Sequence, residues 1–259
     1  MHRFSVQILA ALLILTLAAC NRSSAPSSAD QETNKSLPKA SVDPATAATV
    51  SGTVTFTGAA PKPQKIDMSM DPSCRAKDAL SAPVQVSDGR LANAFVYVKS
   101  GLPEAQWDVP ATEATIDQDG CRYHPHVLGV MTGQKVRILN SDDTTHNIHP
   151  IPQNKRNREW NRSQGPKAEP IVTSFSAEEV MIPIKCNQHP WMKMYLNVLT
   201  HPFFAVTTDN GKFDLKGLPP GTYTVAVVHE KLGEQTQQIT IGPKENKATD
   251  FSYSSASAR

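Results

Sequence analysis

The chain has 259 residues, a formal net charge of +2 at pH 7 and an apolar content of 39%. This length fits one large domain or two small ones. The near-neutral charge, without a basic block or interleaved basic and aromatic residues, argues against nucleic acid as a partner. Beyond the N-terminus the sequence predicts no ordinary transmembrane helix, because no apolar stretch reaches about 20 residues.

The N-terminus has the layout of an export signal. Arg3 precedes an apolar run from Val6 to Leu17, and small residues lead to Cys20. The Leu-Ala-Ala-Cys ending resembles a bacterial lipobox, which implies a signal peptide over residues 1–19, lipidation of Cys20 and contact with a bilayer. An ordinary signal peptide with a chance cysteine is the alternative. Asn21 favours the periplasmic face of the outer membrane by resemblance to enteric sorting rules, while the inner membrane and the cell surface stay open.

Residues 20–47 are rich in Ser, Ala, Pro, Lys and Gln and have almost nothing to bury. We expect a disordered tether there, with a root-mean-square reach of roughly 25–30 Å.

From residue 48 the pattern becomes β. Short alternating segments are separated by Gly, Pro and Asp turns, and no segment sustains a 3.6-residue apolar period. The sequence therefore predicts an all-β chain with a β-sandwich over 48–200. Strands are expected within 49–58, 91–101, 113–121, 126–133, 133–143 and 180–185.

Residues 150–170 form a long polar insertion in that predicted sandwich. A loop of this length is usually functional or disordered. Its basic residues and Trp160 are free to face a partner, or Trp160 to fold back onto the sandwich, and no ligand is assigned to it.

Residues 201–254 contain further strand signals, with an Asp-Asn-Gly hairpin turn at 209–211. The segment from Gly211 to Val225 has the pattern G-x-F-x-L-x-G-L-P-P-G-T-Y-T-V. It resembles the carboxypeptidase-regulatory-like module, a small prealbumin-type β-sandwich, which implies an accessory unit without catalysis. Residues 255–259 are expected to be a disordered tail. The strands before Gly89 exceed what a minimal sandwich over 48–200 requires, and either pair with the main sandwich or form a partial domain of their own.

Potential metal ligands gather after two of the predicted strands. His146 follows the strand of 133–143, and Cys186, His189 and Met192 follow the strand of 180–185 with the spacing Cys-x-x-His-x-x-Met. Two imidazoles, one thiolate and a weak thioether form the ligand set of a blue-copper electron-transfer site. Each residue alone has a structural alternative, as a buried small side chain, a capping histidine or a core methionine.

This layout resembles that of the cupredoxins, with the Cys-x-x-His-Pro-aromatic-Met loop nearest to amicyanin and plastocyanin. The resemblance implies a Greek-key cupredoxin-like sandwich and one mononuclear type 1 copper, with His146, Cys186 and His189 in plane and Met192 axial. It also implies that Asn147 ties the two ligand loops together and donates its backbone N–H to the thiolate. Met194 competes with Met192, and His149 with His146.

Two of the remaining cysteines invite pairing. Cys20 is assigned to lipid and Cys186 to metal, which leaves Cys74 and Cys121. An exported compartment is oxidising, so a disulfide between them is expected, with two free buried thiols as the alternative.

The loop histidine of such proteins usually offers an exposed edge to redox partners, and Pro190 and Trp191 would form an apolar collar around it for docking. In the alternative, Trp191 packs under the C-terminal module and the route to copper is partly covered. The His-Cys-His bridge of multicopper oxidases is absent, so we do not expect an enzyme. The expected function is that of an exported, membrane-anchored one-electron carrier that meets a donor and an acceptor protein transiently. A periplasmic copper store or chaperone and a non-redox surface scaffold lipoprotein are the alternatives, and the sequence does not indicate an oligomeric state.

Overall fold

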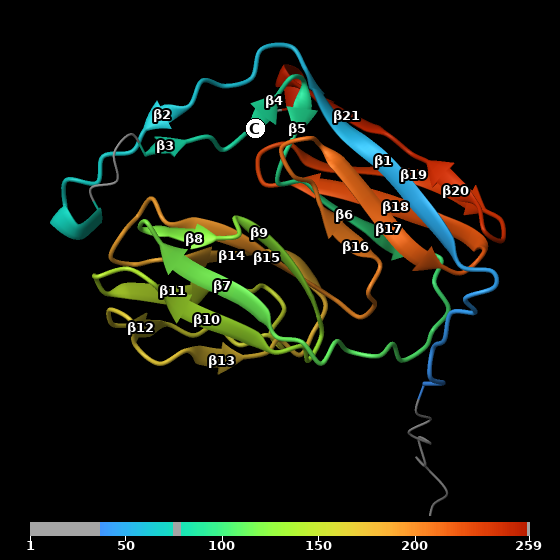
Figure 1. The fold of residues 1–259 in the computed structure, drawn as a ribbon, viewed down its shortest axis with the longest axis horizontal. Helices are drawn as coiled ribbons and strands as arrows, with labels where there is room; N and C mark the ends of the chain where they lie inside the picture. Colours follow the sequence, from blue (N-terminus) through green and yellow to red (C-terminus); the bar gives the residue numbers. More distant parts are fainter. Residues whose placement is uncertain (1–36, 75–78, 258–259) are drawn as a thin grey trace, which may run out of the picture. The chain divides into compact units, whose positions relative to one another are not determined.

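The computed structural model describes residues 37–74 and 79–257. Regular structure within these residues consists of strands and two short 3₁₀ turns, which confirms the expected all-β class (Figure 1). Residues 1–36, including the predicted signal peptide and Cys20, lie outside the described part.

The first β-sandwich is formed by the middle of the chain. One sheet has the order β13-β10-β7-β8 and the other β12-β11-β14-β15-β9, with parallel pairs at β10/β7 and β15/β9. Its core includes Ile116, Ile138, Ile182 and Leu196. The strands are β7 (Ala114–Asp119), β8 (Arg122–His124), β9 (Val127–Met131), β10 (Val136–Asn140), β11 (His146–Pro150), β12 (Arg162–Gln164), β13 (Ile171–Thr173), β14 (Glu179–Lys185) and β15 (Lys193–Leu199).

The second sandwich combines strands from both ends of the described chain. One sheet is built on β17-β1-β5-β4, with β20 and β21 also paired to β1, and the other has the order β16-β6-β18-β19. The strands are β1 (Ala48–Thr57), β4 (Val86–Ser87), β5 (Arg90–Leu91), β6 (Phe95–Ser100), β16 (Phe204–Val206), β17 (Lys212–Leu218), β18 (Gly221–His229), β19 (Gly233–Ile241), β20 (Asn246–Ala248) and β21 (Phe251–Ser254).

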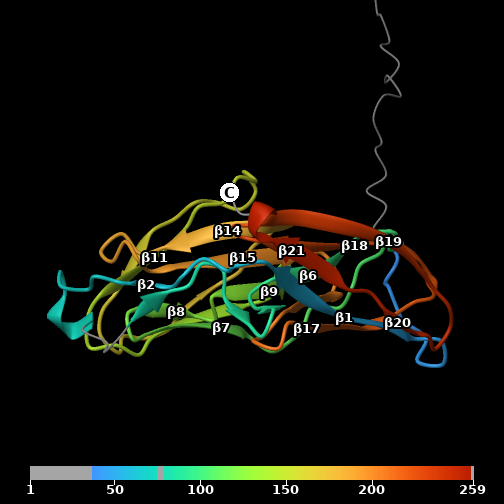
Figure 2. The same cartoon turned by 90° about the horizontal axis from the view of Figure 1, so that it is seen from above.

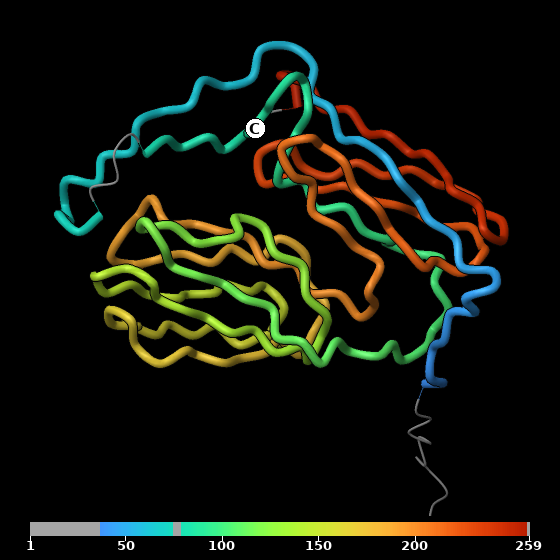
Figure 3. Tube along the Cα trace, in the orientation of Figure 1, coloured from blue at the N-terminus to red at the C-terminus, as the bar shows by residue number. Residues whose placement is uncertain are grey.

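This pairing corrects the expected division into 48–200 and 201–254. β1 is antiparallel to β17, and β6 lies between β16 and β18, so the N-terminal strands complete the C-terminal sandwich (Figure 3). The first sandwich, which carries the predicted ligand loop, is thus an insertion between β6 and β16. An alternating pattern specifies which face of a strand is buried but not which strand lies beside it, and the sequence order was therefore misleading.

Two predicted disordered segments are partly ordered. Within the expected tether, Lys39 and Gln106 form an isolated β-bridge, and the backbone N–H of Ala40 donates to Gln106 O at 2.8 Å. Val42 packs against the core of the second sandwich. The tether therefore ends before these residues. At the other end, Ser255–Ser257 form a 3₁₀ turn, where a disordered tail was expected.

A two-stranded ribbon leaves the second sandwich and reaches the first. This arm, residues 58–85, contains β2 (Gln64–Lys65), the 3₁₀ turn η1 (Pro72–Cys74) and β3 (Leu80–Ser81), of which 75–78 are not described. Figure 2 shows η1 beyond β2 at the end of the ribbon. Three contacts attach it to the first sandwich: the Cys74–Cys121 disulfide, a bond from the Arg122 guanidinium to Leu80 O at 2.6 Å, and the contacts of Asp71 described below.

The two sandwiches pack closely along β9. Phe95 and Phe204 of the second sandwich face Gly129 of β9. The ring centroids of the two phenylalanines are 5.6 Å apart. A Cβ at Gly129 would lie 2.6 Å from the Phe204 ring, so only glycine permits this approach.

The expected insertion at 150–170 is more ordered than a plain loop. It carries β12, which pairs with β11. The side-chain amide of the buried Asn157 donates to the Ala177 carbonyl and accepts from the Ala177 N–H. Trp160 packs against the first core, with the Arg162 guanidinium 5.3 Å from its ring centroid. The folded-back alternative for Trp160 is therefore the one observed.

Candidate metal centre

Three expected ligands meet at one end of the first sandwich. His146 is the first residue of β11, while Cys186 and His189 lie in the turn between β14 and β15. Because β11 is antiparallel to β14, the start of β11 is brought to the end of β14. The ligand atoms of the three residues lie within 4.8 Å of one another, and the residues are 0–3% exposed.

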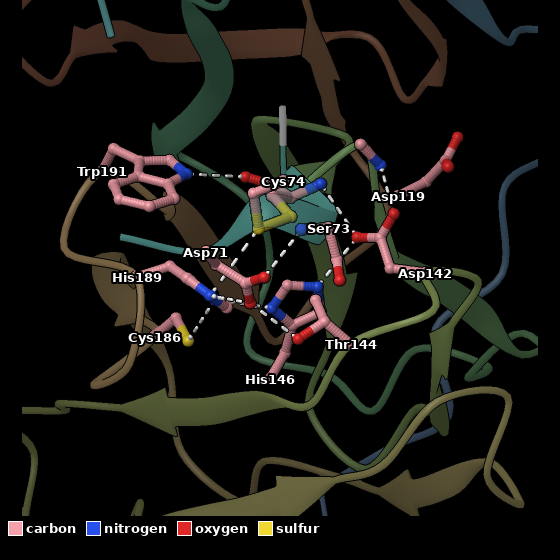
Figure 4. Close-up of a disulfide and its surroundings, with 12 residues drawn as sticks. Asp71, Ser73, Cys74, Asp119, Asp142, Thr144, His146, Cys186, His189 and Trp191 are labelled. Carbon is pink, nitrogen blue, oxygen red and sulfur yellow. Dashed lines mark hydrogen bonds and ion pairs between the residues drawn. A yellow bond between two sulfur atoms is a disulfide. The ribbon is translucent and has the colours of Figure 1, made fainter. Parts of the chain in front are cut away.

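The donor atoms point toward a common point (Figure 4). His146 Nδ1 is 2.9 Å from His189 Nδ1, and Cys186 Sγ is 3.7 Å from His189 Nδ1. The backbone N–H of Asn147 donates to Cys186 Sγ at 3.3 Å, as the resemblance implied. Two imidazole nitrogens and one thiolate in a buried pocket make a set that soft or borderline metals prefer.

A carboxylate lies behind each imidazole. His146 Nε2 is 2.8 Å from Asp142 Oδ2, and His189 Nε2 is 3.1 Å from Asp71 Oδ2. A carboxylate that accepts the Nε2 proton leaves the Nδ1 lone pair free and fixes the ring orientation. Both histidines are therefore arranged to present Nδ1 to a metal.

The electrostatics of the site favour these forms. Bonds from the Thr144 hydroxyl at 2.7 Å and from the Ser73 backbone N–H at 2.8 Å, together with His189, lower the pKa of Asp71 to about 2, so that its carboxylate is ionised. Burial lowers the pKa of His146, and the nearby Asp142 opposes this shift. Burial thus favours the neutral imidazole, the form that binds metals.

Met192 lies opposite Cys186 at the end of the hairpin. The N–H of Cys186 donates to Met192 O at 3.2 Å, and the N–H of Met192 donates to His189 O at 2.9 Å. Met194 pairs with Ile184 within β15, two residues beyond Met192, and so lies further from the turn that carries Cys186. Both thioethers are buried, but only Met192 is level with the thiolate, which favours it as the fourth donor.

The side chain of Asn147 acts differently from the expectation. Its Nδ2 lies 3.2 Å from both Asn161 Oδ1 and Ser163 Oγ, so it ties β11 to the insertion. The Tyr123 hydroxyl donates to the Asn147 carbonyl. Only the backbone of Asn147 links the two ligand loops.

His149, the competitor of His146, faces other groups. Its Nδ1 is 2.9 Å from Asn187 Oδ1 and its Nε2 is 2.8 Å from Glu159 Oε1. It does not join the three donors, so the structure favours His146.

The expected disulfide between Cys74 and Cys121 is confirmed, and it lies against the site. Cys74 Sγ is 3.6 Å from His189 Nε2, and the N–H of Cys121 donates to Asp142 Oδ2 at 2.8 Å. Sequence reasoning missed Asp71, Asp142 and this contact. Asp142 precedes His146 by four residues in one turn and could have been considered, whereas nothing near Asp71 in the sequence connects it to His189.

The expected exposed edge of the loop histidine is absent. His189 is 3% exposed, because the arm covers it with Asp71 and Cys74. Pro190 is exposed, while Trp191 is half-buried and donates from Nε1 to Cys121 O at 3.1 Å. The predicted collar around an exposed histidine is therefore wrong, since the covering arm comes from a distant part of the sequence.

None of the helical turns in 37–74 and 79–257 is long and apolar enough to span a membrane. The predicted lipidation site Cys20 lies outside these residues.

Comparisons with known proteins give similar solved structures only. No protein-family model and no curated protein matches the chain. Amicyanin from Paracoccus versutus is 18% identical, covering 40% of this chain and 96% of its own, with a TM-score of 0.30. A purple cupredoxin from Nitrosopumilus maritimus is 24% identical, covering 33% and 98%, with a TM-score of 0.28.

A copper-containing nitrite reductase from Thermus scotoductus is 18% identical over 38% of this chain, with a TM-score of 0.31, and the match spans only 25% of the reductase. These likenesses concern less than half of the chain. The metal site is therefore assigned from its own residues.

Proposed function

We propose that this protein binds one copper ion through His146, Cys186, His189 and Met192 and carries single electrons between redox proteins. The observation that carries the proposal is the meeting of two Nδ1 atoms and one Sγ in a buried site. A trigonal set of two imidazoles and a thiolate with a weak thioether suits copper in both of its oxidation states. The names of the similar structures, amicyanin and a purple cupredoxin, agree with this choice.

The chain's own residues would keep that site rigid. Asp142 and Asp71 hold the two imidazole rings by their Nε2 atoms, and the Asn147 N–H withdraws charge from the Cys186 thiolate. Bound copper supplies a one-electron redox change. Burial excludes water from the ligands and fixes their positions, which limits the rearrangement that electron transfer requires.

The same ligand set argues against catalysis at this site. Catalytic metal sites keep a position open for water or substrate. We propose that Met192 completes the set formed by His146, Cys186 and His189 in this buried site, leaving no such position, and that the protein is a carrier rather than an enzyme.

We further propose that Cys20 anchors the protein to a membrane on the exported side. The Cys74–Cys121 disulfide supports an oxidising compartment. Mass spectrometry of the mature N-terminus would detect a diacyl- or triacyl-modified Cys20, and a Cys20→Ser variant should be released into the soluble fraction. An unmodified N-terminus cut elsewhere would overturn the anchor.

The test of the copper site is an absorption and electron paramagnetic resonance spectrum of the protein loaded with Cu(II). An intense thiolate-to-copper charge-transfer band with narrow hyperfine splitting is expected, and Cys186→Ser should abolish both. Replacing Met192 with Leu should change the spectrum more than replacing Met194. A pale spectrum that Cys186→Ser leaves unchanged would refute the carrier.

Copper storage is the second candidate, and the cover over His189 favours it. Asp71 and the disulfide close the Nε2 edge of His189, the edge at which a redox partner would otherwise exchange electrons with the site. Storage predicts slow electron self-exchange together with Cu(I) transfer to an acceptor protein. The carrier predicts fast self-exchange and negligible transfer, so measuring both rates separates the two.

A further inference from the structure

The cover over His189 raises the question of how electrons would reach the site. Its Nε2 edge faces Asp71 Oδ2 at 3.1 Å and Cys74 Sγ at 3.6 Å, and the ring is 3% exposed (Figure 4). A partner cannot touch this imidazole while the arm is in place. Another side chain must connect the site to solvent.

Trp191 has the required position. Its ring centroid is 5.2 Å from that of His189, with an interplanar angle of 41°. Its Nε1–H donates to Cys121 O at 3.1 Å, which holds the indole in place. Trp191 is half-buried, and it lies in the chain between the two expected ligands His189 and Met192. One side of the indole therefore contacts the metal site while part of the residue remains accessible.

The accessible side of Trp191 lines a cavity of about 1130 Å³. The arm, the start of β9, the turn after His189 and the loops at 206–209 and 230–231 form its walls. Its apolar lining includes Ile66, Val127 and Val206. This volume slightly exceeds the usual range for small-molecule sites, about 300–1,000 Å³.

The charges around this cavity are unbalanced. Three cationic side chains line it, those of Arg122, Lys193 and Lys231, and within the described part of the chain none has an ion-pair partner. The two acidic residues are already engaged. Glu230 Oε1 lies 2.6 Å from His126 Nε2, and Asp209 Oδ1 accepts from the Gln85 amide at 2.7 Å. Because the Gln85 amide is neutral, Asp209 keeps its charge, and three positive side chains line the cavity against two negative ones, an excess of one positive charge that favours an anion.

We propose that this cavity binds a small redox-active anion and that electrons cross between the anion and the metal site through Trp191. This inference rests on the proposed function and adds the class of one partner and its route. The oxidised anion takes up one electron from the reduced site, or the reduced anion delivers one, and no bond is made or broken. A small anion is favoured over a protein surface because Trp191 lies within a recess.

The cavity can be tested without metal, by quenching the tryptophan fluorescence of the apoprotein. The signal of Trp191 is obtained as the difference between the wild type and Trp191→Phe. Once the quenching by each ion is divided by its quenching of free N-acetyltryptophanamide, iodide should quench this component about threefold more strongly than caesium, since an electropositive cavity concentrates anions even when salt screens it. Lys193→Glu together with Lys231→Glu should reverse the preference. Lys216→Glu with Lys247→Glu, outside the cavity, should leave it unchanged.

Equal quenching by the two ions, or no response to the reversal of Lys193 and Lys231, would overturn the binding site. This result does not depend on copper, so it is distinguishable from failure of the proposed function.

The route is tested on the copper-loaded protein with hexacyanoferrate(III) as the anionic oxidant. Its rate should saturate with concentration and fall about tenfold or more in the double charge reversal. Trp191→Leu should lower the saturated rate while leaving the charge-transfer band in place. An unchanged rate in Trp191→Leu, or equally fast oxidation by a large acidic cytochrome c, would overturn the route.

Discussion

Nε2 of His189 lies 3.1 Å from Oδ2 of Asp71, 118 residues earlier in the chain. The Thr144 hydroxyl donates to the same oxygen at 2.7 Å, so Asp71 bridges the two loops that carry the histidines. The contact makes the arm part of the metal centre, because the arm orients a ligand and excludes water from it.

Asp71→Asn should weaken copper binding by about 10–100-fold, as is typical when the carboxylate behind a ligand histidine is lost. The amide still accepts a hydrogen bond but carries no charge to polarise the imidazole. Competition with a chromophoric chelator measures the affinity. Asp67→Asn is the matched control, since the Asp67 carboxylate in the same arm bonds to the nearby Ser69, whose backbone N–H donates to it at 2.9 Å, and has no contact with His189 within the described residues. Equal affinities for the two variants would contradict this role.

Removing the disulfide should loosen the cover over His189. Cys74→Ser with Cys121→Ser should lower the free energy of unfolding of the apoprotein by about 4 kcal/mol in the chain-entropy model, which urea denaturation measures. His189 should then react faster with diethyl pyrocarbonate, as followed by mass spectrometry. His149, whose side chain is 13% exposed, provides the internal control, because its ring nitrogens face Asn187 and Glu159 rather than the arm. If His189 and His149 keep their relative reactivity, the disulfide is not what holds the cover.

The meeting of His146, Cys186 and His189 was predictable because its signal is local. Cys186, His189 and Met192 share one turn, and His146 follows a recognisable strand, so spacing alone indicated the set. The strand segments were also largely correct, as for β1 and β6, because turn residues delimit them.

Strand partners and the cover over the site were not predictable. β1 pairs with β17 more than 150 residues away, and no feature of either strand identifies the other. Asp71 and Cys74 reach His189 only because the arm crosses between the two sandwiches. The exposed histidine expected from sequence was wrong for this reason.

The close packing of the sandwiches gives a sharp prediction at Gly129. Gly129→Ala places a Cβ 2.6 Å from the Phe204 ring and 2.7 Å from that of Phe95. Overpacking of this kind costs about 1–3 kcal/mol of unfolding free energy, measured in urea. Gly165→Ala is the matched control, because a Cβ added there would meet no neighbouring side chain or backbone within 4 Å. Phe204→Leu should recover part of the loss in the double variant, and strict additivity would disprove the contact.

Acid sensitivity is expected from His229, which is 2% exposed and far in sequence from the expected ligands. Burial lowers its pKa to about 4, against an attraction from Glu230 and together with repulsion from His126 and Lys231. Its Nδ1 accepts the N–H of Lys231 at 3.2 Å, a bond that protonation of this nitrogen would break. The native state therefore favours neutral His229.

The sign of the pH dependence follows from these two states. At pH 6.5 the unfolded chain is about half protonated at His229 while the folded protein keeps this side chain neutral, so stability falls as the pH decreases through this value toward 4. The loss is on the order of 2 kcal/mol at pH 5. Urea denaturation of the apoprotein at pH 7.5 and 5.0 should show this difference shrinking in His229→Gln but not in the control His124→Gln, which removes an exposed histidine. A difference that persists in full in His229→Gln would assign the acid sensitivity to other groups.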